Sequence, residues 1–295
     1  MRRGLVPVLA VLLAGCTTAP SEPTGAPRAA ATPGVAVTKV LTIVEENHGA
    51  ESARDGMPFL ASLARTYGTA TDYRSLSDPS LPNYLLMAGG SDFGVDDNDP
   101  PAEHPLTGPS VFDTALAQGR TARTYADGMP TACALEPVGR YAVKHNPWAY
   151  FADDASRRGC QEHDVPAGTP DAGALHDDVV AGRLPQVGLL VPDLCHDAHD
   201  CSLGTADAWL RDWVRAVQDG PDWRAGRLAL VVTFDEAGDG SSTLLTVVAA
   251  PGLRERVVDQ RLDHLSWSRW MTDLVDAPPL REAADAPSLG AAFGL

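Results

Sequence analysis

The chain contains four runs of mainly aliphatic residues, and each run is long enough to form one buried strand. They are Val35–Val44, Val187–Val191, Leu228–Thr233 and Leu244–Ala249. Continuous Val, Leu and Ile without polar alternation is typical of strands that are covered on both faces of a sheet. Helical spacing of apolar residues predicts four helices between them, at Met57–Tyr67, Val111–Gln118, Thr205–Gln218 and Ser266–Leu274. This alternation predicts an α/β fold, with a doubly wound, mostly parallel sheet carrying helices on both faces.

The first residues have the pattern of an export signal. Arg2 and Arg3 precede an apolar run, Leu5–Ala14, that is too short to span a bilayer. The run ends in Leu-Ala-Gly-Cys, which resembles a bacterial lipobox with Cys16 as the lipidated residue. We therefore expect a lipoprotein signal over residues 1–16 and a lipid-anchored protein outside the cytoplasm. The alternative is a secretory signal that is cleaved slightly later.

Composition then sets the domain boundaries. Residues 17–35 are rich in Thr, Pro, Ala and Gly, which predicts a disordered tether. We expect a single folded domain over residues 36–278. Residues 279–295 form a C-terminal tail, rich in Ala and Pro, that we expect to pack only loosely.

Cysteine usage agrees with export. Without Cys16, an even number of cysteines remains, which in an oxidising compartment indicates two disulfides. Proximity favours pairing Cys133 with Cys160 and Cys195 with Cys201, although three pairings are possible. A zinc cluster is the alternative, but the spacings lack CxxC character.

The formal net charge is −16, which changes the range of possible partners. An acidic surface repels nucleic-acid backbones, so we expect no nucleic-acid partner, and we expect a monomer. A phosphorylated substrate would need local help from a metal ion or from a few basic residues.

Three of the predicted strands end in clusters of acidic and histidine residues. These clusters are Glu45–His48, Asp193–Asp200 and Asp235–Glu236. Ligands of open α/β sheets bind beyond the carboxyl ends of the strands, so the clusters are expected to meet there. Their mutual repulsion predicts a bound cation. Ser80 lies in a proline-flanked turn, and a metal would lower the pKa of its hydroxyl.

Five motifs, in order along the chain, resemble the phosphoesterase family. They are Glu45–Asn47, Pro79–Tyr84, Lys144–Trp148, Asp197–Asp200 and Phe234–Glu236. That family contains bacterial acid phosphatases and phospholipases C, and the likeness extends to secreted mycobacterial phosphatidylinositol phosphatases. It belongs with the alkaline phosphatase superfamily, so the resemblance implies that superfamily's fold and metal-assisted phosphoryl transfer.

The resemblance also implies roles for individual residues. Ser80 matches the nucleophile, and His199 and His145 match candidate proton donors. Lys144 and Asn83 are expected to contact the substrate phosphate. The expected ligands of a divalent metal are Glu46, Asn47, Asp235, Glu236, Asp197, Asp200 and His264. Carboxylate and amide ligands suit Mg, Ca or Mn and histidines suit Zn, so the metal stays open. Asp78 stands where the family often has histidine.

These features predict a metal-dependent hydrolase of phosphomonoesters, similar to acid phosphatases and extending to phosphoinositides, held at a membrane by its lipid. One alternative is a phosphodiesterase of the phospholipase C type at the same site. Another is a non-catalytic lipoprotein that binds a metal or phosphate.

Overall fold

The computed structural model describes residues 1, 4–5, 36–238 and 240–295. The expected signal peptide, lipidation at Cys16 and tether therefore lie outside the described residues, apart from residues 1 and 4–5 at the start of the signal. One compact unit, which ends at Leu295, contains every element below. Within the described ranges, no helix is long and apolar enough to cross a membrane.

A mixed sheet forms the centre of this unit, in the order β4-β3-β5-β1-β6-β7-β2-β8, with β9 beside β2. Strand β7 runs antiparallel to β6 and β2, and the other pairings between the described strands are parallel. The strands are β1 Lys39–Glu45, β2 Gly68–Arg74, β3 Ala122–Ala126, β4 Asp164–Pro166, β5 Val187–Val191, β6 Leu228–Phe234, β7 Thr243–Ala249, β8 Arg256–Val258 and β9 Leu262–Asp263.

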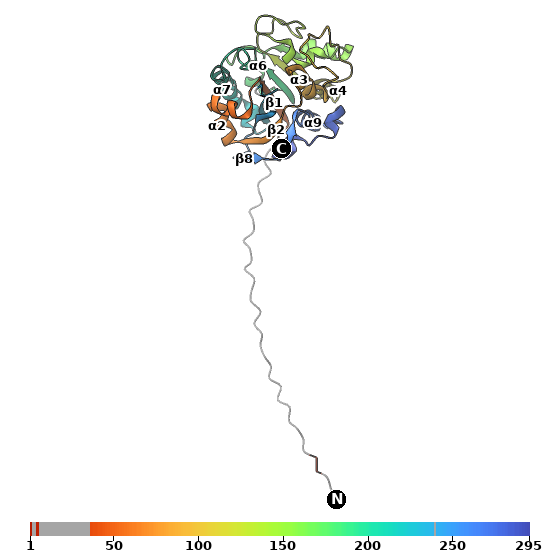
Figure 1. Cartoon of the computed structure of the whole chain (residues 1–295), viewed down its shortest axis with the longest axis vertical. Helices are drawn as coiled ribbons and strands as arrows, with labels where there is room; N and C mark the ends of the chain where they lie inside the picture. The colour runs from red at the N-terminus through yellow and green to blue at the C-terminus, as the bar shows by residue number, and fades with distance from the viewer. Residues whose placement is uncertain (2–3, 6–35, 239) are drawn as a thin grey trace. The chain divides into compact units, whose positions relative to one another are not determined.

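Helices cover both faces of this sheet, as Figure 1 shows for the α2–α7 side and the α3–α4–α9 side. The longer helices are α2 Pro58–Thr66, α3 Ser80–Gly89, α5 Asp154–His163, α7 Leu203–Asp219 and α9 His264–Leu274. The shorter ones are α1 Ala50–Gly56, α4 Val111–Ala117, α6 Ala174–Val180, α8 Pro221–Arg224, α10 Leu289–Phe293 and the 3₁₀ turns η1 Val143–His145, η2 Pro147–Tyr150 and η3 Arg281–Ala284.

The predicted α/β architecture is confirmed. All four predicted strands are present as β1, β5, β6 and β7, and all four predicted helices as α2, α4, α7 and α9, with ends that differ by a few residues. Every residue of β5 and β6 is buried, which agrees with their unbroken aliphatic sequences. Strands β1, β5 and β6 are direct neighbours, with β1 in the middle.

The C-terminal segment packs more tightly than its composition predicted. Leu289 and Phe293 are buried on α10, and Gly290 lies so close to the Trp270 ring of α9 that an added Cβ would collide with it. The expectation of a loosely packed tail is therefore wrong, because spaced apolar residues within the Ala- and Pro-rich stretch join the core.

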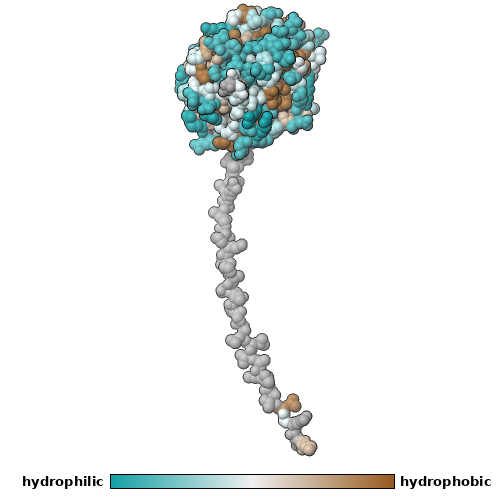
Figure 2. All heavy atoms as spheres, viewed as in Figure 1, coloured by the Kyte–Doolittle hydropathy of each residue, from teal (hydrophilic) through white to brown (hydrophobic). Residues whose placement is uncertain are grey.

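Hydrophilic side chains dominate the face of this unit seen in Figure 2, and apolar ones form only small patches there. This is the surface expected of a chain with a net charge of −16.

Candidate active site

Three adjacent strands deliver the acidic clusters to one edge of the sheet. Parallel strands have their carboxyl ends at the same edge, and β5, β1 and β6 are consecutive and parallel. Two backbone hydrogen bonds continue the pairing past the strands, from Glu46 N to Asp197 O at 2.8 Å and from Asp235 N to Glu45 O at 3.0 Å. The three acidic clusters therefore lie together at one edge of the sheet, as expected.

Ser80 reaches the same edge from a different direction. It is the first residue of α3, and its side chain is buried. Its Oγ donates a hydrogen bond to Glu46 Oε1 over 2.7 Å, and Lys144 Nζ lies 3.2 Å from the same Oγ. The positive end of the helix dipole and the lysine charge both favour an oxyanion at this position.

Glu46 is the common partner of this group. Its Oε1 accepts hydrogen bonds from Ser80, from Lys144 Nζ at 3.0 Å and from Asn47 Nδ2 at 3.3 Å. Burial opposes its ionisation, but the charges of His145 and Lys144 outweigh burial and lower the pKa of Glu46 to about 2. The Glu46 carboxylate is therefore charged at any working pH.

His145 lies fully buried between two carboxylates. Its Nε2 is 2.8 Å from Glu46 Oε2 and its Nδ1 is 3.2 Å from Asp197 Oδ2. Neither contact has hydrogen-bond alignment. Burial alone would lower the pKa of His145, but Glu46 and Asp197 raise it to about 9. A histidine enclosed in this way is poorly placed to give a proton to a leaving group. The expectation that His145 acts as a proton donor is corrected accordingly.

Six buried carboxylate oxygens at this edge have no hydrogen-bond partner among the described residues. They are both oxygens of Glu45, and Glu46 Oε2, Asp197 Oδ2, Asp235 Oδ2 and Glu236 Oε2. Burial, together with the neighbouring Glu46 charge, raises the pKa of Asp235, and burial with Asp78 and Glu46 raises that of Glu236 to about 7. Carboxylate oxygens are ligands of divalent cations, and one ligand atom each of Glu46, His145 and Asp197 lie within 4.8 Å of one another, with Asp235 and Glu236 as acidic neighbours of Glu46, so these residues fit a cation.

Two expected metal ligands have other partners. His264 Nε2 lies 2.6 Å from the Asp235 carbonyl oxygen and Nδ1 lies 3.3 Å from the Tyr73 hydroxyl, so neither nitrogen is free for a metal. Burial lowers the pKa of His264 to about 4, so the ring is neutral and braces the Asp235 backbone. Asp200 Oδ1 instead holds His199 Nδ1 at 2.7 Å and is partly exposed.

Asn83 does not point toward a substrate. Its Oδ1 accepts from the backbone N–H groups of Leu76 and Ser77, at 3.2 and 3.0 Å, and its Nδ2 donates to the Ser77 carbonyl at 2.8 Å. The side chain is fully buried and holds the turn before Ser80 in place. The expected contact of Asn83 with the substrate phosphate is therefore wrong, because backbone groups of the turn already bond its side-chain amide.

His199 is the histidine that faces the open side of the site. Its ring is about one-third exposed, and Nε2 lies 3.8 Å from Glu46 Oε1 while Asp200 holds Nδ1. A carboxylate partner on one nitrogen fixes the ring orientation and leaves the other nitrogen toward the reacting groups.

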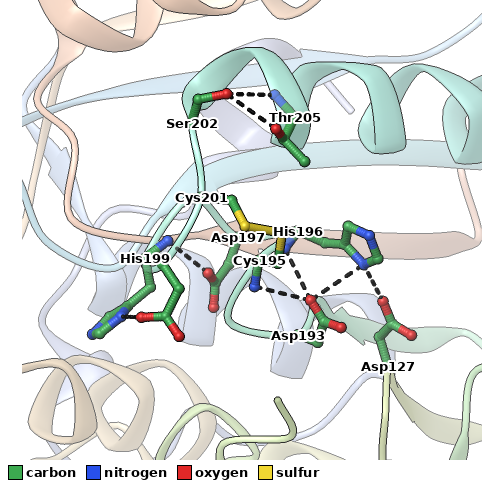
Figure 3. The surroundings of a disulfide bond; sticks show 10 residues. Asp127, Asp193, Cys195, His196, Asp197, His199, Cys201, Ser202 and Thr205 are labelled. Carbon is green, nitrogen blue, oxygen red and sulfur yellow. Dashed lines mark hydrogen bonds and ion pairs between the residues drawn. A yellow bond between two sulfur atoms is a disulfide. The ribbon is translucent and has the colours of Figure 1, made fainter.

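Sequence reasoning did not assign the residues that hold the loop with Asp197 and His199 (Figure 3). His196 Nδ1 lies 2.6 Å from Asp127 Oδ2, and its ring stacks on Trp209 at 5.3 Å. Asp193 Oδ1 accepts from two backbone N–H groups in the loop. Asp127 follows β3, and its position after a strand at the same edge was the available indication.

The two proposed disulfides, Cys133–Cys160 and Cys195–Cys201, are confirmed. The second closes a loop of only six residues' separation around Asp197 and His199 (Figure 3). It therefore fastens the loop that carries two candidate functional side chains to its own base.

Loss of the Cys195–Cys201 disulfide is expected to lower kcat clearly and to lower the free energy of unfolding only modestly. Replacing both cysteines with serine should cost about 2 kcal/mol of unfolding free energy, because the closed loop is short. We expect kcat to fall about tenfold at a temperature where the protein stays folded. The matched control is the Cys133/Cys160 double serine variant, which should cost about 3.5 kcal/mol because its loop is longer, with a smaller change in kcat. Equal losses of kcat in both variants would contradict this expectation.

Asp164 anchors the segment that carries Lys144 and His145. Its buried carboxyl group accepts hydrogen bonds from Thr124 Oγ1 and from Asn146 Nδ2, the latter at 2.8 Å. Burial raises the pKa of Asp164 to about 7, against which the two hydrogen bonds act.

The free energy of unfolding is therefore expected to fall as the pH rises from about 4 to the raised pKa of Asp164, about 7. The folded state keeps the Asp164 proton over a pH range where the unfolded chain has lost it, so its contribution is full below about pH 4 and is lost through pH 7. Between pH 5.5 and 7.5 this group should remove about 2 kcal/mol. Urea unfolding of wild type and Asp164→Asn at both pH values measures it, and an equal pH dependence in the two proteins would contradict it.

Comparisons with known proteins agree with this geometry. The model of the phosphoesterase family matches residues 50–255. A phosphatidylinositol-3-phosphatase of Mycobacterium tuberculosis is 28% identical over 86% of this chain and 82% of its own length. A phosphate-repressible acid phosphatase of Penicillium chrysogenum is 30% identical over 76% of this chain, which spans only 57% of that relative.

The fold also has solved counterparts. A Vibrio parahaemolyticus protein of the alkaline phosphatase superfamily superposes with a TM-score of 0.60 at 10% identity, over 87% of this chain and 70% of that protein. This likeness concerns the fold alone. The family match covers more than half of the chain, so the chain belongs to the phosphoesterase family and is a hydrolase of phosphoric ester bonds.

Proposed function

We propose that this protein is an extracytoplasmic, metal-dependent phosphomonoesterase that uses Ser80 as its nucleophile. The observation that carries the proposal is the contact of one buried serine hydroxyl with both a charged carboxylate and a lysine, Glu46 and Lys144. The acid phosphatase and phosphatidylinositol phosphatase relatives support phosphomonoesters as the substrate class.

Residues at the sheet edge would hold a divalent cation. Glu46, Asn47, Asp235 and Glu236 offer carboxylate and amide oxygens there, and Asp197 contributes a further buried carboxylate. A bound cation would lower the pKa of the Ser80 hydroxyl and offset the charge of the phosphoryl oxygens. Oxygen ligands favour Mg, Ca or Mn over Zn.

The side chains of this chain then have separate tasks. Glu46 accepts the hydrogen bond of the Ser80 hydroxyl and takes its proton, and Lys144 stabilises the serine oxygen that results. The oxygen bonds to phosphorus as the bond to the alcohol breaks, and His199 gives the leaving oxygen a proton. Water then gives a proton to neutral His199 and bonds to phosphorus, the bond from phosphorus to Ser80 Oγ breaks, and Glu46 returns the proton to Oγ as phosphate leaves.

A substrate panel tests the proposal. Purified protein lacking residues 1–16 should hydrolyse p-nitrophenyl phosphate once a divalent metal is supplied, and chelation should abolish the activity. Faster turnover of p-nitrophenyl phosphorylcholine would instead favour the phosphodiesterase function. Absence of turnover with any divalent metal would leave a binding protein.

The location outside the cytoplasm is also part of the proposal. Two disulfides are typical of oxidising compartments. We propose that residues 1–16 direct export, that Cys16 carries the lipid and that residues 17–35 tether the folded domain to the membrane. Mass spectrometry of the N-terminal peptide from the native membrane fraction would test the lipid.

A further inference from the structure

An apolar cavity of about 320 Å³ opens beside the proposed nucleophile, and the function proposed above does not use it. Its walls include Pro100, Pro137, Val143 and Leu194, with the Tyr141 ring. They come from three separate segments of the chain, and the Leu194 backbone N–H donates to the Arg140 carbonyl at 3.0 Å to join two of them. The cavity is therefore built by the tertiary fold rather than by one loop.

Lys144 connects this cavity with the nucleophile. The lysine lines the cavity, and its Nζ lies 3.2 Å from Ser80 Oγ. A second link is Asn98, also in the lining, whose Oδ1 accepts from the Leu81 N–H at 3.0 Å, one residue beyond Ser80 on α3. A substrate at Ser80 therefore lies next to a lysine that also lines this cavity.

A second cavity near the site has the opposite chemistry. It has about 450 Å³ and is lined by Asn47, Ser75, Ser77, Asp78 and Glu236 among others. Its carboxylates and hydroxyls suit water and polar groups. An apolar substituent gains free energy only in the first cavity, because burying apolar surface contributes about 25 cal/mol per Å².

The loop that contributes Glu136 and Pro137 to the cavity also carries exposed apolar side chains. Leu135 and Val138, which flank these two residues in sequence, are 38% and 50% exposed. Their loop is fixed, because the Tyr141 hydroxyl donates to the Ala134 carbonyl at 2.8 Å and Val138 pairs with Tyr141. A rigid loop with exposed apolar side chains extends the apolar surface beyond the cavity.

We propose that this cavity binds the apolar part of the substrate's alcohol, so that the protein prefers phosphate esters that carry an alkyl, acyl or aryl group over those of small polar alcohols. The proposal rests on phosphomonoester hydrolysis at Ser80. The apolar group can come from a soluble ester or from a lipid, and the substrates chosen below separate these sources.

The test is a Leu194→Asn variant, which keeps the size of this half-buried residue and makes the wall polar. Three substrates are compared, namely octyl phosphate, 1-naphthyl phosphate and glycerol 3-phosphate, with a lysophospholipid phosphate in detergent micelles as the lipid arm. We expect kcat/KM for octyl phosphate to fall about tenfold, mainly through KM, since the cavity contacts several methylene groups. Turnover of glycerol 3-phosphate should stay within about twofold of wild type.

The control is Leu76→Asn, the same substitution at an exposed leucine between two serines that line the polar cavity. It should leave the ratio of octyl to glycerol phosphate unchanged. Val143→Thr, which keeps the side-chain volume, provides a second wall variant if Leu194→Asn does not fold. A larger loss with the lysophospholipid than with octyl phosphate would identify a lipid source, and equal losses with the two substrates would identify the apolar group alone.

An unchanged ratio in folded Leu194→Asn, or an equal loss on all substrates, would overturn the proposal. If wild type hydrolyses none of these esters, the proposed function itself fails. Titration calorimetry then decides on the cavity, through the affinity of octylphosphonate relative to methylphosphonate in wild type and Leu194→Asn. A wild-type preference for octylphosphonate that the variant loses supports the cavity, and equal ratios refute it.

Discussion

Ser80→Ala is expected to lower kcat on p-nitrophenyl phosphate by about 10⁴-fold or more, because a nucleophile and its activating groups act as one unit. The hydroxyl is the group that joins Glu46 and Lys144 at the N-terminus of α3. KM should change little, since phosphate contacts with Lys144 remain. Steady-state kinetics with metal in excess measure the effect.

The matched control for Ser80 is Ser77→Ala. Ser77 lies three residues earlier in the same turn, and its described hydrogen bonds to Asn83 use only backbone atoms. This variant should keep wild-type kcat. Near-normal turnover in Ser80→Ala would remove the serine nucleophile from the proposal while leaving the family assignment intact. Trapping of a phosphorylated Ser80 peptide by acid quench gives an independent measurement.

Glu46→Gln is expected to abolish both metal retention and activity. The substitution keeps the shape of the side chain but removes the charge that faces Lys144 and His145 and that a cation would share. We expect metal affinity to fall at least about 100-fold and kcat about 10³-fold or more at fixed metal concentration. Metal analysis after dialysis measures the first, and titration of activity with metal measures the second.

Glu45→Gln serves as the control for this charge. Burial, together with Asp197 and Asp207, raises the pKa of Glu45 well above its usual value, which favours the neutral, protonated form of this neighbouring residue. A neutral isostere should therefore leave metal content and kcat close to wild type. Equal metal binding in wild type and Glu46→Gln would show that the cation, if one is used, is held elsewhere.

The sequence predicted the parts of the molecule that follow from continuous burial. Strands β1, β5 and β6 are aliphatic along most of their length, and acidic residues follow where each aliphatic run ends, although most of them are buried too. The same sequence pattern therefore predicted both the strands and the acidic edge of the sheet. Strand β2 was missed because GTATDYR is polar and only half buried, which resembles a loop.

Side-chain partners were less predictable. The sequence places Asn83 three residues after Ser80, but only the folded turn shows that its amide bonds to Leu76 and Ser77. Likewise, His264 precedes α9 as a late motif residue, yet its ring nitrogens are taken by Tyr73 and the Asp235 backbone. The His264 contacts join residues 191 and 29 positions apart, and the Asn83 contacts depend on how the turn folds, so the spacing of residues in the sequence does not predict either pair.

The disulfide between Cys195 and Cys201 is expected to make activity depend on whether these two cysteines have been oxidised. A newly made chain in a reducing environment has two thiols there, and the segment with Asp197 and His199 lacks its covalent clasp. We expect such a chain to hydrolyse phosphate esters poorly until oxidation occurs, which would spare the phosphorylated metabolites of the cell that makes it. Comparing kcat of the protein refolded with and without an oxidant, with thiols counted in each sample, would reveal whether this delay exists.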